Sequence, residues 1–259
     1  MNPMMTDRGL AQKMIALLQE RATQARIAQV RIGLGYTAVE LESGAVGVAY
    51  TFSDLAKGGC GILHGLRPMT GRPADAVRAW ADPWDAVEAG VGIACANALL
   101  HTDSTPSLPG DILDHLDLNP EDRVGMVGHF GPVVPPLRQR VGELIIFERT
   151  ASPAEGILPQ EDACQLLPTC DVALITGTSF IIHTLGPLLE AARGCREVVV
   201  LGPSTVLCPH LYQETPVTML SGVRVQDGES VLQVVSESGG MRQFRPFIEK
   251  VSLRLDRAQ

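Results

Sequence analysis

Small and polar residues follow four short apolar segments in the second half of the chain, and their types suit ligand binding. The first group is Gly125 together with Gly128-His129-Phe130-Gly131-Pro132. Its spacing is G-x-x-G-x-x-G, which differs from the dinucleotide pattern G-x-G-x-x-G. Glycines let backbone N–H groups approach an anion or a carbonyl closely. The same spacing also fits a tight strand-to-helix turn, so both interpretations stay open.

Glu148 and Arg149 follow the second apolar segment. Glu148 lies 20 positions after Gly128, and in dinucleotide-binding folds an acidic residue about 20 positions beyond the glycines binds ribose hydroxyls. We predict that Glu148 acts as a catalytic base or orients a hydroxyl or amine of the ligand. The alternative is a solvated carboxylate that pairs with Arg149 at the end of a strand.

Hydroxyl-rich groups follow the third and fourth apolar segments. They are Thr176-Gly177-Thr178-Ser179 and Gly202-Pro203-Ser204-Thr205. Ligands of open parallel sheets bind outside the carboxyl ends of the strands, so these groups predict a polar floor that binds carboxylate, phosphate or amide groups. Thr178 or Ser179, and Ser204 or Thr205, also suit helix N-caps, a role compatible with ligand binding.

The first half of the chain offers Asn97 inside the apolar run 91–99. A buried amide needs hydrogen-bond partners, so Asn97 either links two helices or points into a cleft. The loop Lys57-Gly58-Gly59-Cys60-Gly61 is a candidate lid over a ligand, although such loops are often only flexible.

Two short Cys/His spacings are candidate metal sites. They are Cys60-x-x-x-His64 and Cys208-Pro209-His210, with His129 and His183 as single additions. Thiolate and imidazole suit zinc, nickel, copper or cobalt, but each pair supplies two ligands, and isolated Cys and His residues are often structural. His210 is best placed, because it follows the fourth segment. Cys208 and His210 are therefore the candidate metal ligands, and a transition-metal ion or metal chelate is the candidate cofactor.

Apolar segments alternate with helical patterns from residue 123 onward, which predicts a Rossmann-like sheet of parallel strands. The expected strands cover 124–127, 144–147, 172–175, 198–201 and 218–220. The expected helices cover 136–141, 161–167, 180–193 and 209–214. The chain contains no GKS/GKT phosphate loop and no G-x-S-x-G nucleophile elbow.

The first third predicts a small α+β unit. Asp7 is expected to cap a helix that buries Leu10, Met14, Leu17 and Leu18. Alternating apolar residues at 30–34, 39–41 and 46–52 predict an antiparallel meander. Two further helices are expected, one starting at Pro73 and burying Ala76, Val77 and Trp80, the other starting at Asp82-Pro83 and burying Val87, Val91, Ala94 and Leu99. A Pro/Ser/Asp-rich connection over 101–120 places the domain boundary near 118, giving domains 1–118 and 119–259.

The composition is that of a soluble globular protein: 259 residues, 45% hydrophobic, with a formal net charge of −8. An acidic chain without Lys/Arg runs and with 4% aromatic residues argues against a nucleic-acid partner. No export signal and no apolar run of about 20 residues is present, which argues against a membrane. Six scattered cysteines indicate reduced thiols and a cytoplasmic location.

Several of these segments together resemble a bacterial and archaeal family, that of the putative heavy-metal chelation proteins. The resemblance covers essentially the whole chain, including Tyr36-Thr37-Ala38-Val39. The segments that carry it are 93–99, DRVGMVGHFGP over 122–132, FER over 147–149, CDVALITGT over 170–178, LGPST over 201–205 and LSGV over 220–223.

The resemblance implies an enolase N-terminal-like domain joined to a Rossmann-like domain, with a ligand site between them and a role in handling or making metal chelates. No established reaction comes with it. The matching candidate residues are Asn97, Gly128, Phe130, Gly131, Glu148, Arg149, Thr176, Gly177, Thr178, Gly202, Pro203 and Ser204. The chain departs from the family at Ile182, where Asn is usual, and Cys208-Pro-His210 is not typical of the family.

We therefore expect a protein that binds a small polar, metal-chelating ligand between its two domains; the sequence leaves open whether it is an enzyme. One alternative is a non-catalytic metal carrier that uses Cys208 and His210, with His129 as a further candidate. Another is a nucleotide- or S-adenosylmethionine-binding enzyme. Besides the small-molecule ligand, the candidate partners are a second copy of the chain and proteins of metal transport or cofactor assembly.

Overall fold

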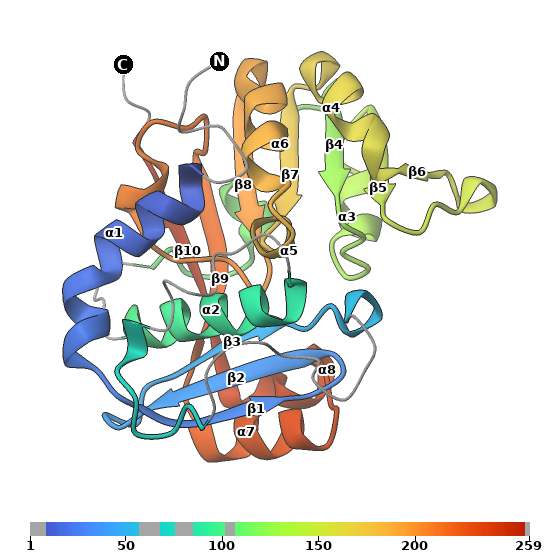
Figure 1. Cartoon of the computed structure of the whole chain (residues 1–259). Coiled ribbons are helices and arrows are strands. Elements are labelled where there is room, and N and C mark those ends of the chain that lie inside the picture. Colours follow the sequence, from blue (N-terminus) through green and yellow to red (C-terminus); the bar gives the residue numbers. More distant parts are fainter. Residues whose placement is uncertain (1–8, 57–67, 76–84, 102–106, 257–259) are drawn as a thin grey trace.

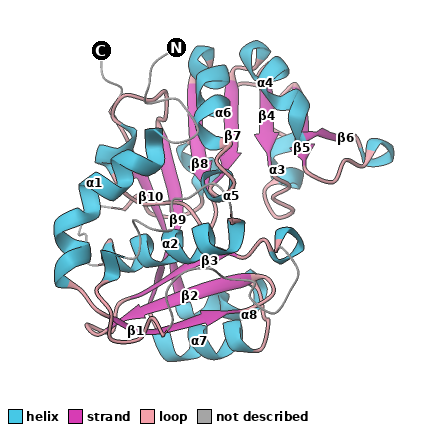
Figure 2. Ribbon diagram, viewed as in Figure 1, coloured by secondary structure: helices cyan, strands magenta, loops and turns pink. Residues whose placement is uncertain are grey.

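The structure, a computed structural model, describes residues 9–56, 68–75, 85–101 and 107–256. A three-stranded antiparallel sheet lies in the N-terminal module (residues 9–101), and a seven-stranded, mostly parallel sheet lies in the C-terminal module (residues 107–256). Figure 1 and Figure 2 show the two sheets with helices around each. The mixed α/β class predicted from the sequence is confirmed.

The N-terminal module begins with a helix and continues as the predicted meander. Its elements are α1 (Gly9–Gln24), β1 (Ile27–Ile32), β2 (Tyr36–Leu41), β3 (Val46–Tyr50), the 3₁₀ turn η2 (Ser53–Leu55) and α2 (Ala86–Leu99). The strands neighbour one another in the order β1-β2-β3. The alternation at 30–34 overestimates the first strand, because β1 ends at Ile32 and Leu34 is 69% exposed in the following turn.

Helix α2 lies at the centre of the molecule, against β2, β3, α1 and a short helix of the other module. Eleven of its 14 residues are buried. Its N-cap is Asp85, whose carboxylate accepts from Val87 N and Glu88 N, so the predicted start at Asp82-Pro83 is wrong. The approach of β3 is close: a Cβ on Gly47 would lie 2.2 Å from Ala94 O, so only glycine fits there.

The predictions for Asp7, Ala76, Val77, Trp80 and the 57–64 segment with Cys60 and His64 concern residues outside the described ranges. The connection over 101–120 contains one described 3₁₀ helix, η4 (Ile112–His115), whose Asp111 cap accepts from Leu113 N.

The C-terminal sheet has six parallel strands and one antiparallel strand among the described residues. Its strands are β4 (Arg123–Val127), β5 (Glu143–Glu148), β6 (Ile157–Pro159), β7 (Val172–Thr176), β8 (Glu197–Leu201), β9 (Met219–Val225) and β10 (Ile248–Arg254). The parallel strands follow the order β6-β5-β4-β7-β8-β9, which is the strand order of dinucleotide-binding folds. The order reverses between β4 and β7.

The helices of this module are short. They are α3 (Val134–Arg138), α4 (Ala163–Leu166), α5 (Thr178–Ile181), α6 (Leu185–Ala191), α7 (Gly228–Ser236) and α8 (Met241–Phe244). The 3₁₀ helices are η5 (Pro153–Glu155), η6 (Gln160–Asp162), η7 (Leu167–Thr169), η8 (Ala192–Gly194), η9 (Pro209–Tyr212) and η10 (Arg245–Phe247). The helix expected over 180–193 is wrong as one element: it is divided into α5 and α6 near His183, whose φ is +58°, a conformation that a helix does not contain.

Helices α7 and α8 lie between β9 and β10 in sequence but cover the N-terminal sheet in space. Helix α7 contacts β1 and β2, and Figure 1 shows α7 on the face of that sheet opposite α2. Val231 and Val235 of α7 are fully buried in one apolar cluster with Ala38 and Val48. The N-terminal sheet therefore has a helix of its own module on one face and a helix from the C-terminal half on the other.

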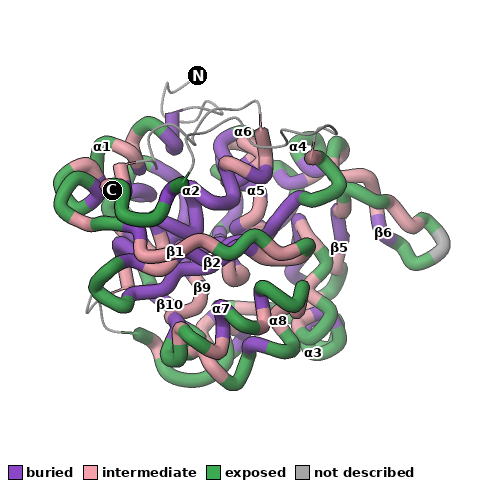
Figure 3. Tube along the Cα trace, turned by 60° about the horizontal axis from the view of Figure 1, so that its bottom comes forward, coloured by how far each residue is buried: buried purple, intermediate pink, exposed green. Residues whose placement is uncertain are grey.

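Burial follows this layering. Strands β7 and β8 are nearly continuous buried runs, as expected for parallel strands covered on both faces. Figure 3 shows buried segments through the middle of the molecule, with exposed segments on the outer sides of α3, α7 and α8.

Candidate functional site

A cavity of about 500 Å³ lies at the carboxyl ends of β4, β5 and β7, which point toward the N-terminal module in Figure 1. We call this cavity the crevice. From the C-terminal module it is lined by Gly128, His129, Phe130, Glu148, Arg149, Thr150, Gln160, Thr176, Thr178, Ser179 and Ile182. From the N-terminal module it is lined by Tyr50, Phe52, Ser53 and Asp54. It thus spans the reversal of strand order between β4 and β7, where ligands of open α/β sheets bind.

The turn after β4 brings Gly128 and Phe130 to the wall of the crevice. Gly128 has φ +93°, and a Cβ there would lie 2.9 Å from Thr176 Cβ, so both backbone and packing require glycine. The predicted backbone donors are partly occupied, because Gly128 N donates to Phe147 O and His129 N donates to Glu148 Oε1. Within the described part of the chain, the N–H groups of Phe130 and Gly131 donate to no protein atom.

Glu148 holds this turn in place with its carboxylate. Oε1 accepts from His129 N at 3.2 Å, and Oε2 accepts from Arg149 N at 3.1 Å. The alternative of an ion pair with Arg149 is wrong, since the Arg149 side chain binds elsewhere. Because an ionised carboxylate has about four lone-pair sites, Glu148 keeps acceptor capacity at the edge of the crevice.

Arg149 connects the two modules across the mouth of the crevice. Its Nη2 lies 2.7 Å from Asp54 Oδ2, and its Cζ lies 5.0 Å from the centroid of the Phe52 ring. The hydrogen bond from Arg149 lowers the pKa of Asp54 below its usual range. Both side chains of the ion pair are solvent-exposed, so the pair contributes little to stability. We therefore infer that its role is to define the shape and the charge of the opening of the crevice.

The hydroxyl-bearing residues at the end of β7, Thr176, Thr178 and Ser179, lie on the floor of the crevice. Thr176 Oγ1 and Thr178 Oγ1 are hydrogen-bonded to each other at 2.9 Å, and Thr178 N donates to Thr176 Oγ1. Ser179 is fully buried, and its Oγ finds no partner among the described residues. The N-cap position of α5 is Gly177, so the predicted capping by Thr178 or Ser179 is wrong.

The end of β8 supports the crevice from behind. Ser204 Oγ accepts from Tyr50 N at 2.9 Å, which ties the last strand of the N-terminal sheet to the C-terminal module. A Cβ on Gly177 would lie 2.6 Å from Thr205 N, so the two strand ends touch. Gly202 has φ +109° and borders the Phe130 ring. Gly202, Pro203, Ser204 and Thr205 are absent from the lining of the crevice, and Ser204 and Thr205 precede no helix that they cap.

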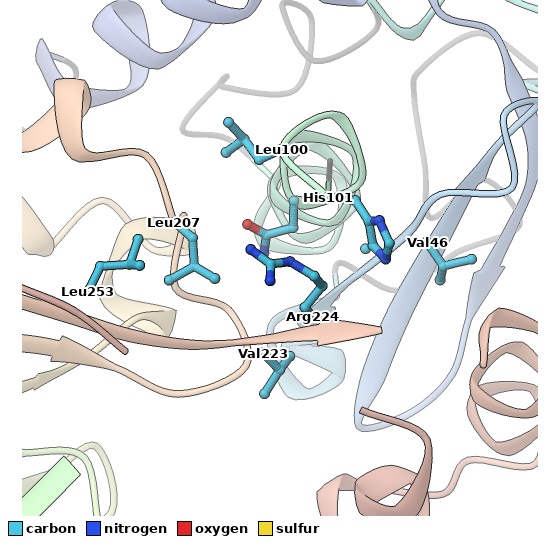
Figure 4. A pocket seen from close by; sticks show the side chains of 9 residues that line it. Val46, Leu100, His101, Leu207, Val223, Arg224 and Leu253 are labelled. Atoms are coloured by element: carbon cyan, nitrogen blue, oxygen red, sulfur yellow. The ribbon is translucent and has the colours of Figure 1, made fainter. Parts of the chain in front are cut away.

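Asn97 faces a second, much smaller cavity. Its Nδ2 donates to Val48 O at 3.1 Å, so it ties α2 to β3. The cavity beside it, of about 20 Å³, is lined by Val46, Gly47, Asn97, Leu100, His101, Leu207, Val223, Arg224 and Leu253 and is shown in Figure 4. Its volume suits about one water molecule. Asn97 is therefore not part of the crevice.

Cys208 and His210 lie in and beside η9, which packs against α1. Cys208 is buried, and His210 Nδ1 accepts from Gln213 Nε2 on the surface. Neither residue lines the crevice, against the expectation that His210 reaches it. No group of three or more His, Cys, Asp or Glu side chains in the described ranges is arranged to hold a metal ion. The described donor set therefore does not fit a metal site made by the protein alone. The described cysteines form no disulfide bond.

The residues from the N-terminal module were not singled out from the sequence. Tyr50 and Phe52 belong to the alternating pattern predicted over 46–52, and no prediction from the sequence covers Ser53 or Asp54. What could have indicated them is their position in the sequence. Two aromatic residues and an acidic residue follow the predicted hairpin and precede a glycine-rich stretch. Their meeting with β4, β5 and β7 depends on how the modules pack.

Comparison with family models gives two matches, and both models carry the description "putative heavy-metal chelation". Residues 15–100 match one model and residues 111–254 the other. The second match alone spans more than half of the chain. The chain belongs to this family. The resemblance seen in the sequence is thereby confirmed.

Proteins similar to this chain include relatives within the putative heavy-metal chelation family. A crystal structure of a family member of unknown function from Desulfitobacterium hafniense has a TM-score of 0.78 and 23% identity, covering 95% of this chain and 98% of that one. A second, from Pyrococcus horikoshii, has a TM-score of 0.83 and 21% identity, covering 95% and 100%. An uncharacterised protein from Methanocaldococcus jannaschii is 26% identical over 180 residues, 68% of this chain and 70% of that one.

The solved relatives show the fold. As to membranes, none of the helices in the described ranges combines the length and the apolar character that crossing a bilayer requires.

Proposed function

We propose that the protein binds a small polar, metal-chelating organic ligand in the crevice and serves heavy-metal chelation or metallocofactor metabolism. The observation that carries the proposal is the crevice itself: about 500 Å³ at the reversal of strand order, with walls from both modules. This volume lies in the range of sites for small molecules and cofactors. The family description supplies the link to metals.

The lining suits a polar ligand better than a bare ion. The hydroxyls of Thr176 and Thr178 offer both donors and acceptors, whereas transition metals prefer thiolate, imidazole and carboxylate ligands in sets of three or four. Since the described side chains form no such set, a metal would reach the crevice as a complex with its organic ligand. The organic ligand then provides the metal-binding atoms, and the protein recognises the complex.

The proposal is tested by what the purified protein carries. Protein is prepared without added chelator from cells grown with excess nickel, zinc and iron, and the material released on denaturation is measured by mass spectrometry and elemental analysis. We expect an organic ligand together with metal. The double variant Thr176→Val/Thr178→Val removes two floor hydroxyls with little change of volume, and it should lose both.

The control is Cys208→Ala/His210→Ala, which should retain ligand and metal. Stoichiometric metal without an organic ligand, lost in this control, would instead establish the carrier function. A wild-type protein that releases neither organic ligand nor metal would also contradict the proposal.

A further inference from the structure

We infer that the crevice takes a phosphate-free, positively charged ribonucleoside beside Glu148. This inference rests on the proposed function in one respect, that the crevice is the ligand site. Three features of the described residues carry it: the place of Glu148 in the sheet, the state of the turn after β4, and the charge of the lining.

The place of Glu148 is that of a ribose-binding carboxylate. It ends β5, the strand next to β4 in a sheet with the dinucleotide strand order, and in such sheets the acidic residue at this point accepts hydrogen bonds from ribose hydroxyls. Two backbone N–H groups already fix the orientation of the carboxylate. The remaining lone pairs of its two oxygens match the two hydroxyls of a ribose.

The turn after β4 lacks the donor arrangement of a dinucleotide phosphate loop, and its N–H groups without a protein acceptor among the described residues are those of Phe130 and Gly131. The N–H groups of Gly128 and His129 are already donated to Phe147 O and to Glu148. The Phe130 ring lies against Gly128, 3.5 Å from the position of a Cβ there, in the space that a phosphate would need. Helix α3 is only five residues long and begins with Val134-Pro135-Pro136. Proline lacks the N–H that helix N-termini offer to phosphates, so the first turn of α3 supplies no set of free N–H groups for a pyrophosphate.

The charge of the lining favours a cation. The described charged residues that line the crevice are Glu148, Asp54 and Arg149, and Arg149 is engaged by Asp54 and by the face of Phe52. The three side chains together therefore carry a net negative charge, equal to that of one carboxylate. Tyr50 and Phe130 also line the crevice, and the faces of aromatic rings attract cations. A sulfonium or ammonium group on the nucleoside fits this lining, and the hydroxyls on the β7 side remain for the polar ligand.

Isothermal titration calorimetry on the full chain tests the inference with S-adenosylmethionine, S-adenosylhomocysteine, adenosine, ATP and NAD. We expect adenosine to bind at least tenfold more tightly than ATP and NAD, because the phosphates would meet the Glu148 carboxylate and find no free N–H groups at the start of α3. S-adenosylmethionine should bind more tightly than S-adenosylhomocysteine, which lacks the sulfonium charge. The inference is overturned if ATP or NAD binds as tightly as adenosine, if the sulfonium makes no difference, or if no nucleoside binds at millimolar concentration.

Glu148→Gln gives the residue-level test, and Glu143→Gln, at the other end of β5, is its matched control. We expect Glu148→Gln to weaken adenosine binding at least tenfold and the control to leave it unchanged. Wild-type protein should bind 2′-deoxyadenosine more weakly than adenosine, and Glu148→Gln should lose this preference. A preference that survives in Glu148→Gln would contradict the role of Glu148, and the wild-type comparison stands even if that variant folds poorly.

The two proposals fail in different ways. If no nucleoside binds, but the wild-type protein releases an organic ligand that Thr176→Val/Thr178→Val lacks, the ligand class is wrong and the crevice remains the site. If the floor variant also retains its ligand, the crevice itself is wrong.

Discussion

At the scale of single residues, the contact between Gly128 and Thr176 shows how the crevice is formed. Gly128 combines a positive φ with a neighbouring strand end so close that a Cβ would lie 2.9 Å from Thr176 Cβ. The absence of a side chain lets β4 and β7 end side by side and leaves room for the Phe130 ring. The turn is therefore held rigidly by close packing, and its geometry requires a residue without a Cβ at position 128.

Gly128→Ala should destabilise the protein by about 1–3 kcal/mol, since alanine is strained at positive φ and its Cβ meets Thr176. Gly131→Ala is the control three residues away, because no atom lies within 4 Å of a Cβ there; its change should stay within about 0.5 kcal/mol. Urea unfolding midpoints measure both. Equal losses for the two variants would show that neither the positive φ of Gly128 nor its contact with Thr176 sets the cost.

At the scale of elements, the two modules are held together by contacts between segment ends. Ser204, after β8, accepts the N–H of Tyr50 at the end of β3, and Arg149, after β5, binds Asp54 within η2. The first bond is partly buried and the second is exposed. A desolvated polar group that loses its hydrogen-bond partner destabilises the fold more than an exposed one does. The hydrogen bond to Ser204 therefore contributes more to the packing of the modules than the ion pair does.

Ser204→Ala should cost about 1–3 kcal/mol of stability, because it leaves the N–H of Tyr50 without its acceptor. Thr205→Val is the matched control: Thr205 Oγ1 is buried and finds no partner among the described residues, so its replacement by a methyl group should be neutral or stabilising. Thermal unfolding of the two variants decides the matter. A larger loss for Thr205→Val than for Ser204→Ala would mean that the hydroxyl of Thr205 has a role in the fold.

The sequence predicts those elements whose pattern is set by burial. Strands β4, β5, β7 and β8 read as apolar runs because both faces are covered. The elements it does not predict, β6, α7, α8 and β10, are short or have their apolar residues directed toward a distant segment. The site follows the same division. Gly128, Glu148 and Thr176 could be found from strand ends, whereas Tyr50 and Asp54 could not, since their role depends on how the modules pack.

At the scale of the whole molecule, the two sheets share helices. The C-terminal half supplies α7 to one face of the N-terminal sheet, while α2 on the other face also contacts α5. The apolar cluster of α7 contains residues from both halves of the chain, Val48 and Val235 among them. The domain division near residue 118 remains a proposal, and these shared contacts predict that the two modules unfold together.

Val235→Ala tests this coupling. Val235 is fully buried, so we expect a loss of about 1–3 kcal/mol from the cavity that its truncation leaves. Pulsed hydrogen exchange during urea unfolding should show peptides from β2 and from β7 losing protection at the same, lowered urea concentration. The control is Glu229→Gln, which replaces an exposed residue on the same helix. If β2 lost protection early and β7 were unchanged, the modules would be independent.

The insertion of α7 between β9 and β10 has a consequence for synthesis of the protein. The ribosome releases the three strands of the first sheet about two hundred residues before the helix that covers them. During that interval Ala38, Val46 and Val48, all of which contact the α7 cluster in the finished protein, have no cover from it. A nascent chain stopped before residue 228 therefore presents an apolar face on its first sheet, and synthesis of α7 (Gly228–Ser236) supplies the residues that cover it.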